Sequence, residues 1–164
     1  MKRLSLAFLV VLVSVAALAS ASTTASAAPA IKAPFSATLQ ITEYLGYERA
    51  WTDEEGVWHV RGWSMKGNVS GDINGQIEII ENANMGMYPS GNLDVQLKGV
   101  ITVSGEEAYR ITADLTISSG GVISSSNFVL HGMGSFKGIH ITGTITVIDL
   151  THSLLTGTKL TTKP

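Results

Sequence analysis

The chain of 164 residues contains no cysteine. No disulfide can therefore stabilise the fold, and no thiol is available as a nucleophile or a metal ligand. Charge is also scarce: charged residues make up 15% of the chain, with 13 acidic and 11 basic residues. Binding to nucleic acids or to anionic membranes requires a positive surface, so we expect neither partner.

The N-terminus has the pattern of an export signal. Two basic residues precede an apolar run over 4–18, and two A-x-A sites ending at Ala21 and Ala27 follow it. This run is shorter than the roughly 20 residues of a membrane-spanning helix. We therefore expect a signal peptide over 1–27, cleaved after Ala21 or Ala27, and a flexible spacer over 28–34. The mature protein is expected to be secreted or extracytoplasmic, in the periplasm or at the cell surface, without stable membrane insertion.

From Phe35 onward, apolar and polar residues alternate with a period of two. This period is typical of strands with one buried face. The clearest pair covers 93–103 and 109–117, and Asn74-Gly75 is a typical hairpin dipeptide. No window of a dozen residues after the expected signal has helical periodicity.

Seven to nine such strands predict a single all-β domain over 35–164, an antiparallel barrel of about eight strands. A β-sandwich is the alternative. Glycines within strands, such as Gly62, Gly99 and Gly143, favour the barrel because closing a sheet requires local kinks. The irregular segment over 82–92 is expected to be a loop.

Two glycine-rich segments carry a family resemblance. Arg61–Gln76, RGWSMKGNVSGDINGQ, and Leu130–Ile145, LHGMGSFKGIHITGTI, resemble the small secreted barrels related to allene oxide cyclase and the dirigent proteins. Those barrels end in a glycine-phenylalanine-glycine strand pair similar to Gly134, Phe136 and Gly138. The resemblance implies an eight-stranded barrel with a hydrophobic lumen, but it carries over no catalytic residue.

No motif for catalysis, metal or cofactor binding stands out. The glycines of the second segment precede a strand, whereas a phosphate-binding glycine loop precedes a helix. The four histidines, His59, His131, His140 and His152, lack the near spacing of zinc ligands. We therefore predict no catalytic residue, no metal site and no cofactor.

The aromatic residues in the first half of the mature chain are the best functional lead. His59, Arg61 and Trp63 share one side of a strand, whereas Trp58 and Val60 share the other. The sequence leaves open which side faces inward. If the first side does, His59 and Arg61 would anchor an acidic apolar ligand such as a fatty acid.

We therefore expect a secreted, non-catalytic barrel that binds a small apolar molecule in its lumen. The candidate lumen residues are His59, Arg61, Trp63, Tyr109 and Phe128. One alternative is a structural or surface-assembly protein that pairs through sheet edges as a homo-oligomer. The other is a cyclase- or dirigent-type enzyme, which rests on the resemblance and would require an inward polar group such as His59, Arg61, Glu78 or Asp114.

Overall fold

The computed structural model describes residues 29–86, 91–118 and 123–162. The expected signal peptide over 1–27 lies outside these ranges. The described residues contain no helix that is long and apolar enough to cross a membrane.

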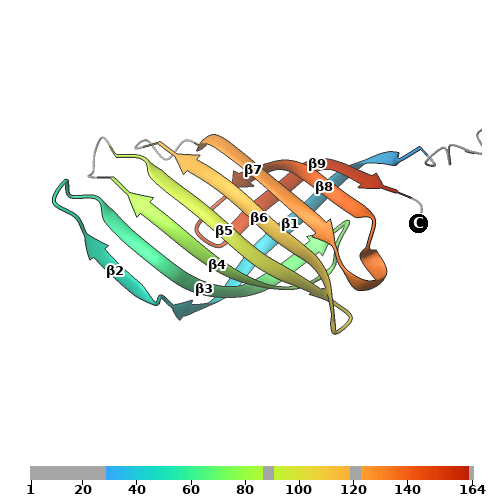
Figure 1. Ribbon diagram of the computed structural model, residues 1–164, viewed down its shortest axis with the longest axis horizontal. Helices are drawn as coiled ribbons and strands as arrows, with labels where there is room; N and C mark the ends of the chain where they lie inside the picture. The colour runs from blue at the N-terminus through green and yellow to red at the C-terminus, as the bar shows by residue number, and fades with distance from the viewer. Residues whose placement is uncertain (1–28, 87–90, 119–122, 163–164) are drawn as a thin grey trace, which may run out of the picture.

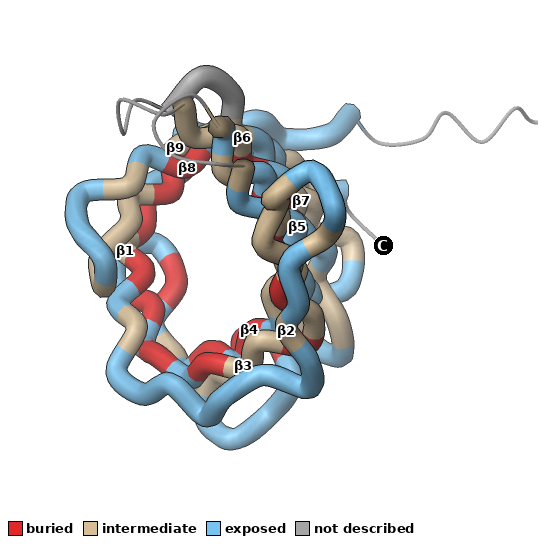
Figure 2. Tube along the Cα trace, turned by 90° about the vertical axis from the view of Figure 1, so that its left-hand side faces the viewer, coloured by how far each residue is buried: buried red, intermediate tan, exposed pale blue. Residues whose placement is uncertain are grey.

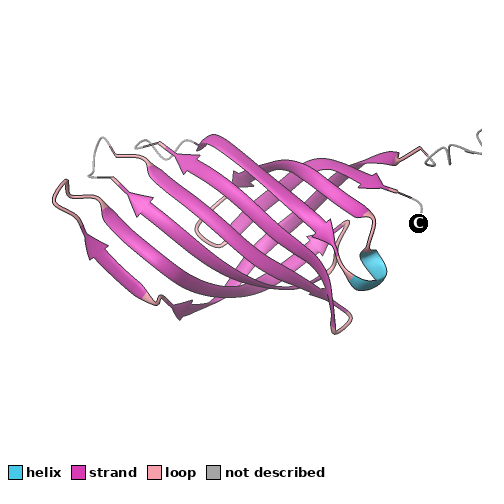
Figure 3. Ribbon diagram, viewed as in Figure 1, coloured by secondary structure: helices cyan, strands magenta, loops and turns pink. Residues whose placement is uncertain are grey.

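Strands make up almost all of the described chain, and the single helical element is one short 3-10 turn (Figure 3). The strands are β1 (Ile31–Gly46), β2 (Arg49–Thr52), β3 (Trp58–Gly71), β4 (Gly75–Met85), β5 (Leu93–Val103), β6 (Glu106–Ile117), β7 (Ile123–Gly132), β8 (Ile139–Val147) and β9 (His152–Thr161), and the 3-10 turn is η1 (Gly134–Phe136). Every strand pairing is antiparallel (Figure 1).

The sheet closes on itself. Its strand order is β1-β9-β8-β7-β6-β5-β4-β3, and a further pairing of β3 with β1 completes the ring. The ring is visible along the long axis of the molecule (Figure 2). The fold is therefore an eight-stranded antiparallel barrel, as predicted, and the sandwich alternative is excluded. Among the described strands, β2 pairs with β3 alone and leaves one short edge open.

Alternate residues of each strand point into the lumen, where they form one continuous apolar core. The rings of Phe35 on β1 and Phe128 on β7 meet across it with their centroids 6.1 Å apart. The largest fully buried side chains are Phe128, Ile77, Ile101, Ile111, Leu130, Ile141, Leu155 and Val60. Figure 2 shows the buried positions lining the inside of the ring. The central lumen is thus packed with side chains.

Three boundaries differ from the sequence prediction. β1 begins at Ile31, inside the expected spacer, and Pro34 is tolerated there because β3 pairs with β1 only from Ala37 onward. β4 continues to Met85, beyond the point where a loop was expected. The first long hairpin turns over 72–74, with the positive φ at Gly71 and not at the Asn-Gly pair.

A bulge in β3 reverses the facing of its residues. Val60 pairs with Ala83 and Trp63 pairs with Glu81, so Arg61 and Gly62 together occupy the place opposite one residue of β4. Gly62 has φ +67°, and an added Cβ there would collide with the side chain of Glu48. As a result, Val60 and Trp63 both face the lumen although they are three positions apart.

The barrel has a β2 end and an η1 end. The β2 end carries the turn over 53–57 and the turn over 148–151, and the η1 end carries η1 and the C-terminus of β9. In Figure 1 these ends lie at the left and right of the long axis.

Candidate functional site

Some inward-facing side chains near the β2 end are exposed, although Val60 and Ala83 there are buried. On the inward face of β4, Ile77 and Ile79 are fully buried, whereas Met85 at the β2 end is 42% exposed. On β1, Leu39 is buried and Tyr44 is 49% exposed. Tyr44 pairs with the buried Met65, so its side chain belongs to the inward face. Large apolar and aromatic side chains on the inward face are therefore accessible or partly accessible at this end, and Tyr44, Trp58, Trp63 and Met85 are together called the mouth.

An acidic residue lies on this inward face. Glu81 is two positions from Ile79 and two from Ala83, both of which are buried, and β4 has no bulge in its pairing with β5. Its neighbours across the sheet on the same face are Trp63 on β3 and Leu97 on β5. Within the described part of the chain, the Glu81 carboxyl group has no hydrogen-bond or ion-pair partner.

Burial controls the ionisation of this carboxyl group. Desolvation raises the pKa of Glu81 from its ordinary value of 4.5 to about 7. The apolar surroundings favour the neutral acid because the charged form loses its hydration without gaining a partner. At neutral pH the lumen therefore contains an acid poised between its two protonation states, and either state can bond to a donor that enters the mouth.

Aromatic rings surround the mouth. The rings of Tyr44 and Trp63 lie 5.9 Å apart, and the Tyr44 hydroxyl donates a hydrogen bond of 2.9 Å to the carbonyl oxygen of Leu150. This bond joins β1 to the turn after β8. The pairing of β1 with β9 ends at Gln40, so the bond lies beyond the paired part of these strands. Trp58 pairs with Met85 on the inward face. The mouth thus combines aromatic surface with one acid.

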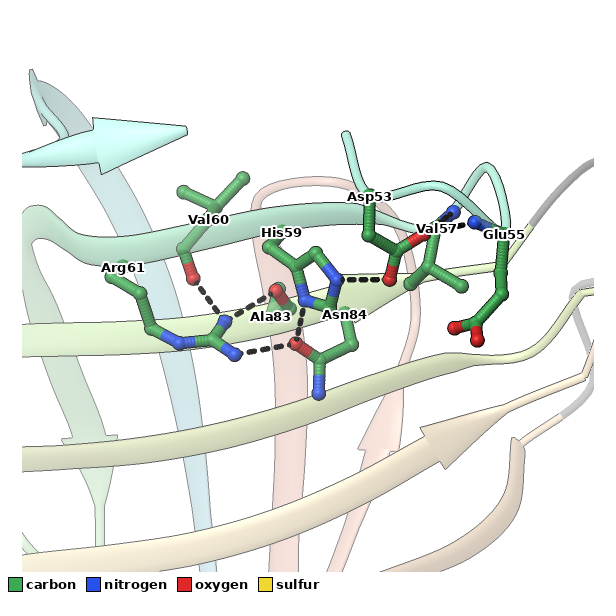
Figure 4. A network of polar contacts seen from close by, with 8 residues as sticks. All are labelled: Asp53, Glu55, Val57, His59, Val60, Arg61, Ala83 and Asn84. Carbon is green, nitrogen blue, oxygen red and sulfur yellow. Dashed lines mark hydrogen bonds and ion pairs between the residues drawn. The ribbon is translucent and has the colours of Figure 1, made fainter. Parts of the chain in front are cut away.

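A separate polar network lies on the outer face of the same end (Figure 4). The His59 ring bonds through Nε2 to Asp53 Oδ2 at 2.7 Å and through Nδ1 to Asn84 Oδ1 at 2.8 Å. The Arg61 guanidinium donates to the same Asn84 oxygen at 2.7 Å and to the carbonyl oxygens of Val60 and Ala83. These contacts tie the β2–β3 turn to β4.

The network fixes the protonation of His59. Arg61 can only donate, so the Asn84 atom that it contacts is the oxygen, and His59 Nδ1 must then donate to that oxygen. Nε2 donates to the Asp53 carboxylate. Accordingly, the hydrogen bonds to Asp53 and then Asn84 raise the pKa of His59, and the bond from His59 lowers the pKa of Asp53. Neither ring nitrogen is left to accept a proton from a substrate, which argues against a general base here.

Stacking adds to this outer-face network. The Trp51 ring of β2 lies parallel to the His59 ring with centroids 4.8 Å apart. The Arg49 and Arg61 guanidinium carbons lie 4.9 and 5.4 Å from the centre of the Trp51 ring. Cations over an indole face are stabilised by its quadrupole. The cluster therefore stabilises the pairing of β2 with β3, which indicates a structural role.

A broad groove of about 600 Å³ also lies on the outer face, over β3 to β6. Leu45, Ile80 and Val100 give it apolar surface, and Lys98 and Arg110 bring positive charge. Glu78 and Glu107 line it as well, so its charges are mixed. This groove is the competing location for a ligand.

The candidate lumen residues divide into two groups. Trp63, Tyr109 and Phe128 face the lumen, and the Tyr109 ring packs against Phe136 with centroids 5.0 Å apart. The lumen position predicted for His59 and Arg61 is wrong. Both lie on the outer face because they flank the inward Val60.

A cyclase- or dirigent-type enzyme would require an inward polar group at one of four positions. Besides His59 and Arg61, these were Glu78 and Asp114, and both are exposed between buried neighbours of their strands. None of the four faces inward. The inward acid is Glu81, which the expected loop over 82–92 placed at the end of its strand. Strict alternation from Ile77 through Ile79 would have identified it.

Comparisons of this chain with protein-family models, with curated proteins and with solved structures found no match.

Proposed function

We propose that the protein is a binding barrel that takes up a small, mainly apolar molecule against the mouth residues at its β2 end, since the central lumen is packed. The observation that carries this proposal is Glu81, an inward acid without a partner among the described residues, set between Trp63 and Leu97. Burying a carboxyl group without a partner costs free energy. A ligand that supplies the missing donor would recover part of this cost on binding.

The chemistry of the mouth selects the ligand. Its apolar part would lie against Trp58, Trp63, Tyr44 and Met85, which are accessible or partly accessible at this end. Its polar part would be a hydroxyl or an amino group that donates to Glu81. An amine has the further advantage of opposite charge, and a hydrogen bond to a charged group contributes about 1.5–3 kcal/mol.

This ligand class replaces the fatty acid that an inward His59 and Arg61 would have favoured. A fatty-acid carboxylate next to Glu81 would meet a like charge in an apolar surrounding. Apolar molecules with an amino or hydroxyl group are thus the class that the mouth fits.

Binding can be tested with three probes of equal chain length: octylamine, octanol and octanoic acid. Tryptophan fluorescence reports on the mouth because Trp58 and Trp63 belong to it. At pH 8 we expect the amine to bind tightest and the acid weakest, with about a tenfold or larger difference in Kd between them. Glu81→Gln should remove this order.

Glu78→Gln is the matched control, since Glu78 lies on the same strand but on its outer face. It should leave the probe order unchanged. Failure of all three probes to bind would overturn the proposal. It would also be overturned if octanoic acid bound best and Lys98→Ala abolished its binding, because the outer groove would then be the site.

A further inference from the structure

Two histidines that are nine positions apart in the chain meet on the outer face. His131 of β7 and His140 of β8 pair directly across the two strands that η1 connects. Their Nδ1 atoms are 3.1 Å apart, and their ring centroids are 4.6 Å apart with the planes inclined by 53°. Both flank inward residues, Leu130 and Ile141, so both rings face solvent.

The spacing of the two nitrogens matches that of two ligands on one metal ion. The bond between Zn²⁺ and an imidazole nitrogen is about 2.0–2.1 Å long. Two such bonds place the nitrogens about 2.9 Å apart at a right angle and about 3.4 Å apart at the tetrahedral angle. The observed 3.1 Å lies between these values. Without a metal, the two Nδ1 atoms can share only one proton, since one must donate and the other accept.

We propose that His131 and His140 form a surface site for a divalent late transition-metal ion. The two Nδ1 atoms supply neighbouring ligands, and water completes the coordination. Imidazole suits Cu²⁺, Ni²⁺ and Zn²⁺, whereas Ca²⁺ and Mg²⁺ require oxygen ligands. The affinity of the site for Cu²⁺, Ni²⁺ and Zn²⁺ should follow the Irving–Williams order, with Cu²⁺ bound most tightly.

The neighbouring charges set the strength of this site. Arg110 pairs with His131 from β6, and Leu160 pairs with His140 from β9, with Lys32 of β1 beyond it. Both charged neighbours are cationic and oppose the binding of a cation. The site therefore depends on its two nitrogen ligands, and removal of a neighbouring charge should strengthen it.

The other two histidines lack this arrangement. His59 is bonded to Asp53 and Asn84, and His152 Nδ1 lies 3.0 Å from Asp149 in a turn. Within the described residues, no three histidine, aspartate or glutamate side chains gather as a metal site. His131 and His140 thus form a two-ligand site.

The test is a titration of the folded barrel with CuSO₄ at pH 7.5, followed by electron paramagnetic resonance and calorimetry. We expect one Cu²⁺ per chain with a spectrum that shows nitrogen ligation. His131→Ala and His140→Ala should each weaken binding by at least tenfold, since even changes beyond the ligands themselves cost 10–100-fold. His152→Ala is the matched control and should bind as the wild type does.

Arg110→Gln removes a neighbouring positive charge and keeps both histidines, so it should increase the Cu²⁺ affinity. Misfolding cannot produce such an increase. Retention of the wild-type Cu²⁺ affinity in both His131→Ala and His140→Ala would overturn the proposal. Equal loss in His152→Ala would overturn it as well. The result is independent of Glu81, which lies on the inward face of β4.

Discussion

Replacement of the inward acid, Glu81→Gln, should make the barrel more stable at alkaline pH. Glutamine has nearly the same shape as the protonated acid and carries no charge. In the wild type, ionisation of Glu81 in the lumen is opposed by desolvation, which raises its pKa to about 7. The variant cannot ionise at this position and so avoids the cost.

The magnitude follows from the difference between the folded and unfolded pKa values. Between the ordinary 4.5 and about 7, the folded state holds a proton that the unfolded state has released, so stability falls as pH rises through this window. Each pKa unit corresponds to 1.36 kcal/mol, which gives a loss of about 3 kcal/mol above pH 7. Glu81→Gln should recover a gain of this order at pH 8 and almost none at pH 4.5.

Urea unfolding at pH 4.5, 6, 7 and 8, followed by tryptophan fluorescence, measures this difference. With an m-value of about 1–3 kcal/mol/M, the midpoint of Glu81→Gln at pH 8 should exceed that of the wild type by about 1–3 M. Glu78→Gln on the outer face of β4 is the control, and its pH profile should follow that of the wild type. Parallel profiles for Glu81→Gln and the wild type would refute the placement of an uncompensated acid in the lumen.

Three further predictions concern other parts of the barrel. Protonated His59 should stabilise the fold below its unfolded pKa, and this contribution should be lost as pH rises through the raised pKa of the folded state. Asp53→Asn should lower the folded-state pKa of His59, which an NMR titration measures. Phe128→Ala should lower the free energy of unfolding by about 3–5 kcal/mol in urea, because it removes a buried ring. Gly143→Ala should lower the thermal midpoint, since the new Cβ would meet the backbone carbonyl oxygen of Thr156, and an unchanged midpoint would contradict the close approach of β8 and β9.

The fold could be predicted because most strands alternate without interruption. The apolar pattern of the β5–β6 hairpin runs from Leu93 to Ile101 and from Tyr109 to Ile117, and the structure pairs the two strands through their length with one bulge between Ile101 and Thr102. One face of such a hairpin must be buried, so its register is defined by the pattern itself. Local alternation was therefore sufficient to predict an antiparallel barrel.

The facing of the polar residues in β3 could not be predicted in the same way. A strict period of two places His59, Arg61 and Trp63 on one side, but the bulge at Arg61 and Gly62 separates Trp63 from the other two. The bulge depends on partners that are distant in the chain: Glu48 lies against Gly62, and Asn82 accepts a hydrogen bond from its N–H. No local pattern encodes those contacts.

The histidine pair illustrates a second limit. His131 and His140 lie on different strands, and their meeting depends on the register that the turn through η1 imposes. A shift of one residue would place one of the rings in the lumen. Spacing along the chain carries no direct sign of such a cross-strand pair.

The most direct test of the binding mouth is native mass spectrometry of the protein purified from its own source, with organic extraction of the bound material. We predict a stoichiometric, mainly apolar molecule with an amino or hydroxyl group, present in the wild type and in Glu78→Gln and lost in Glu81→Gln. A protein that is free of any such molecule, or a ligand that Glu81→Gln retains in full, would contradict it.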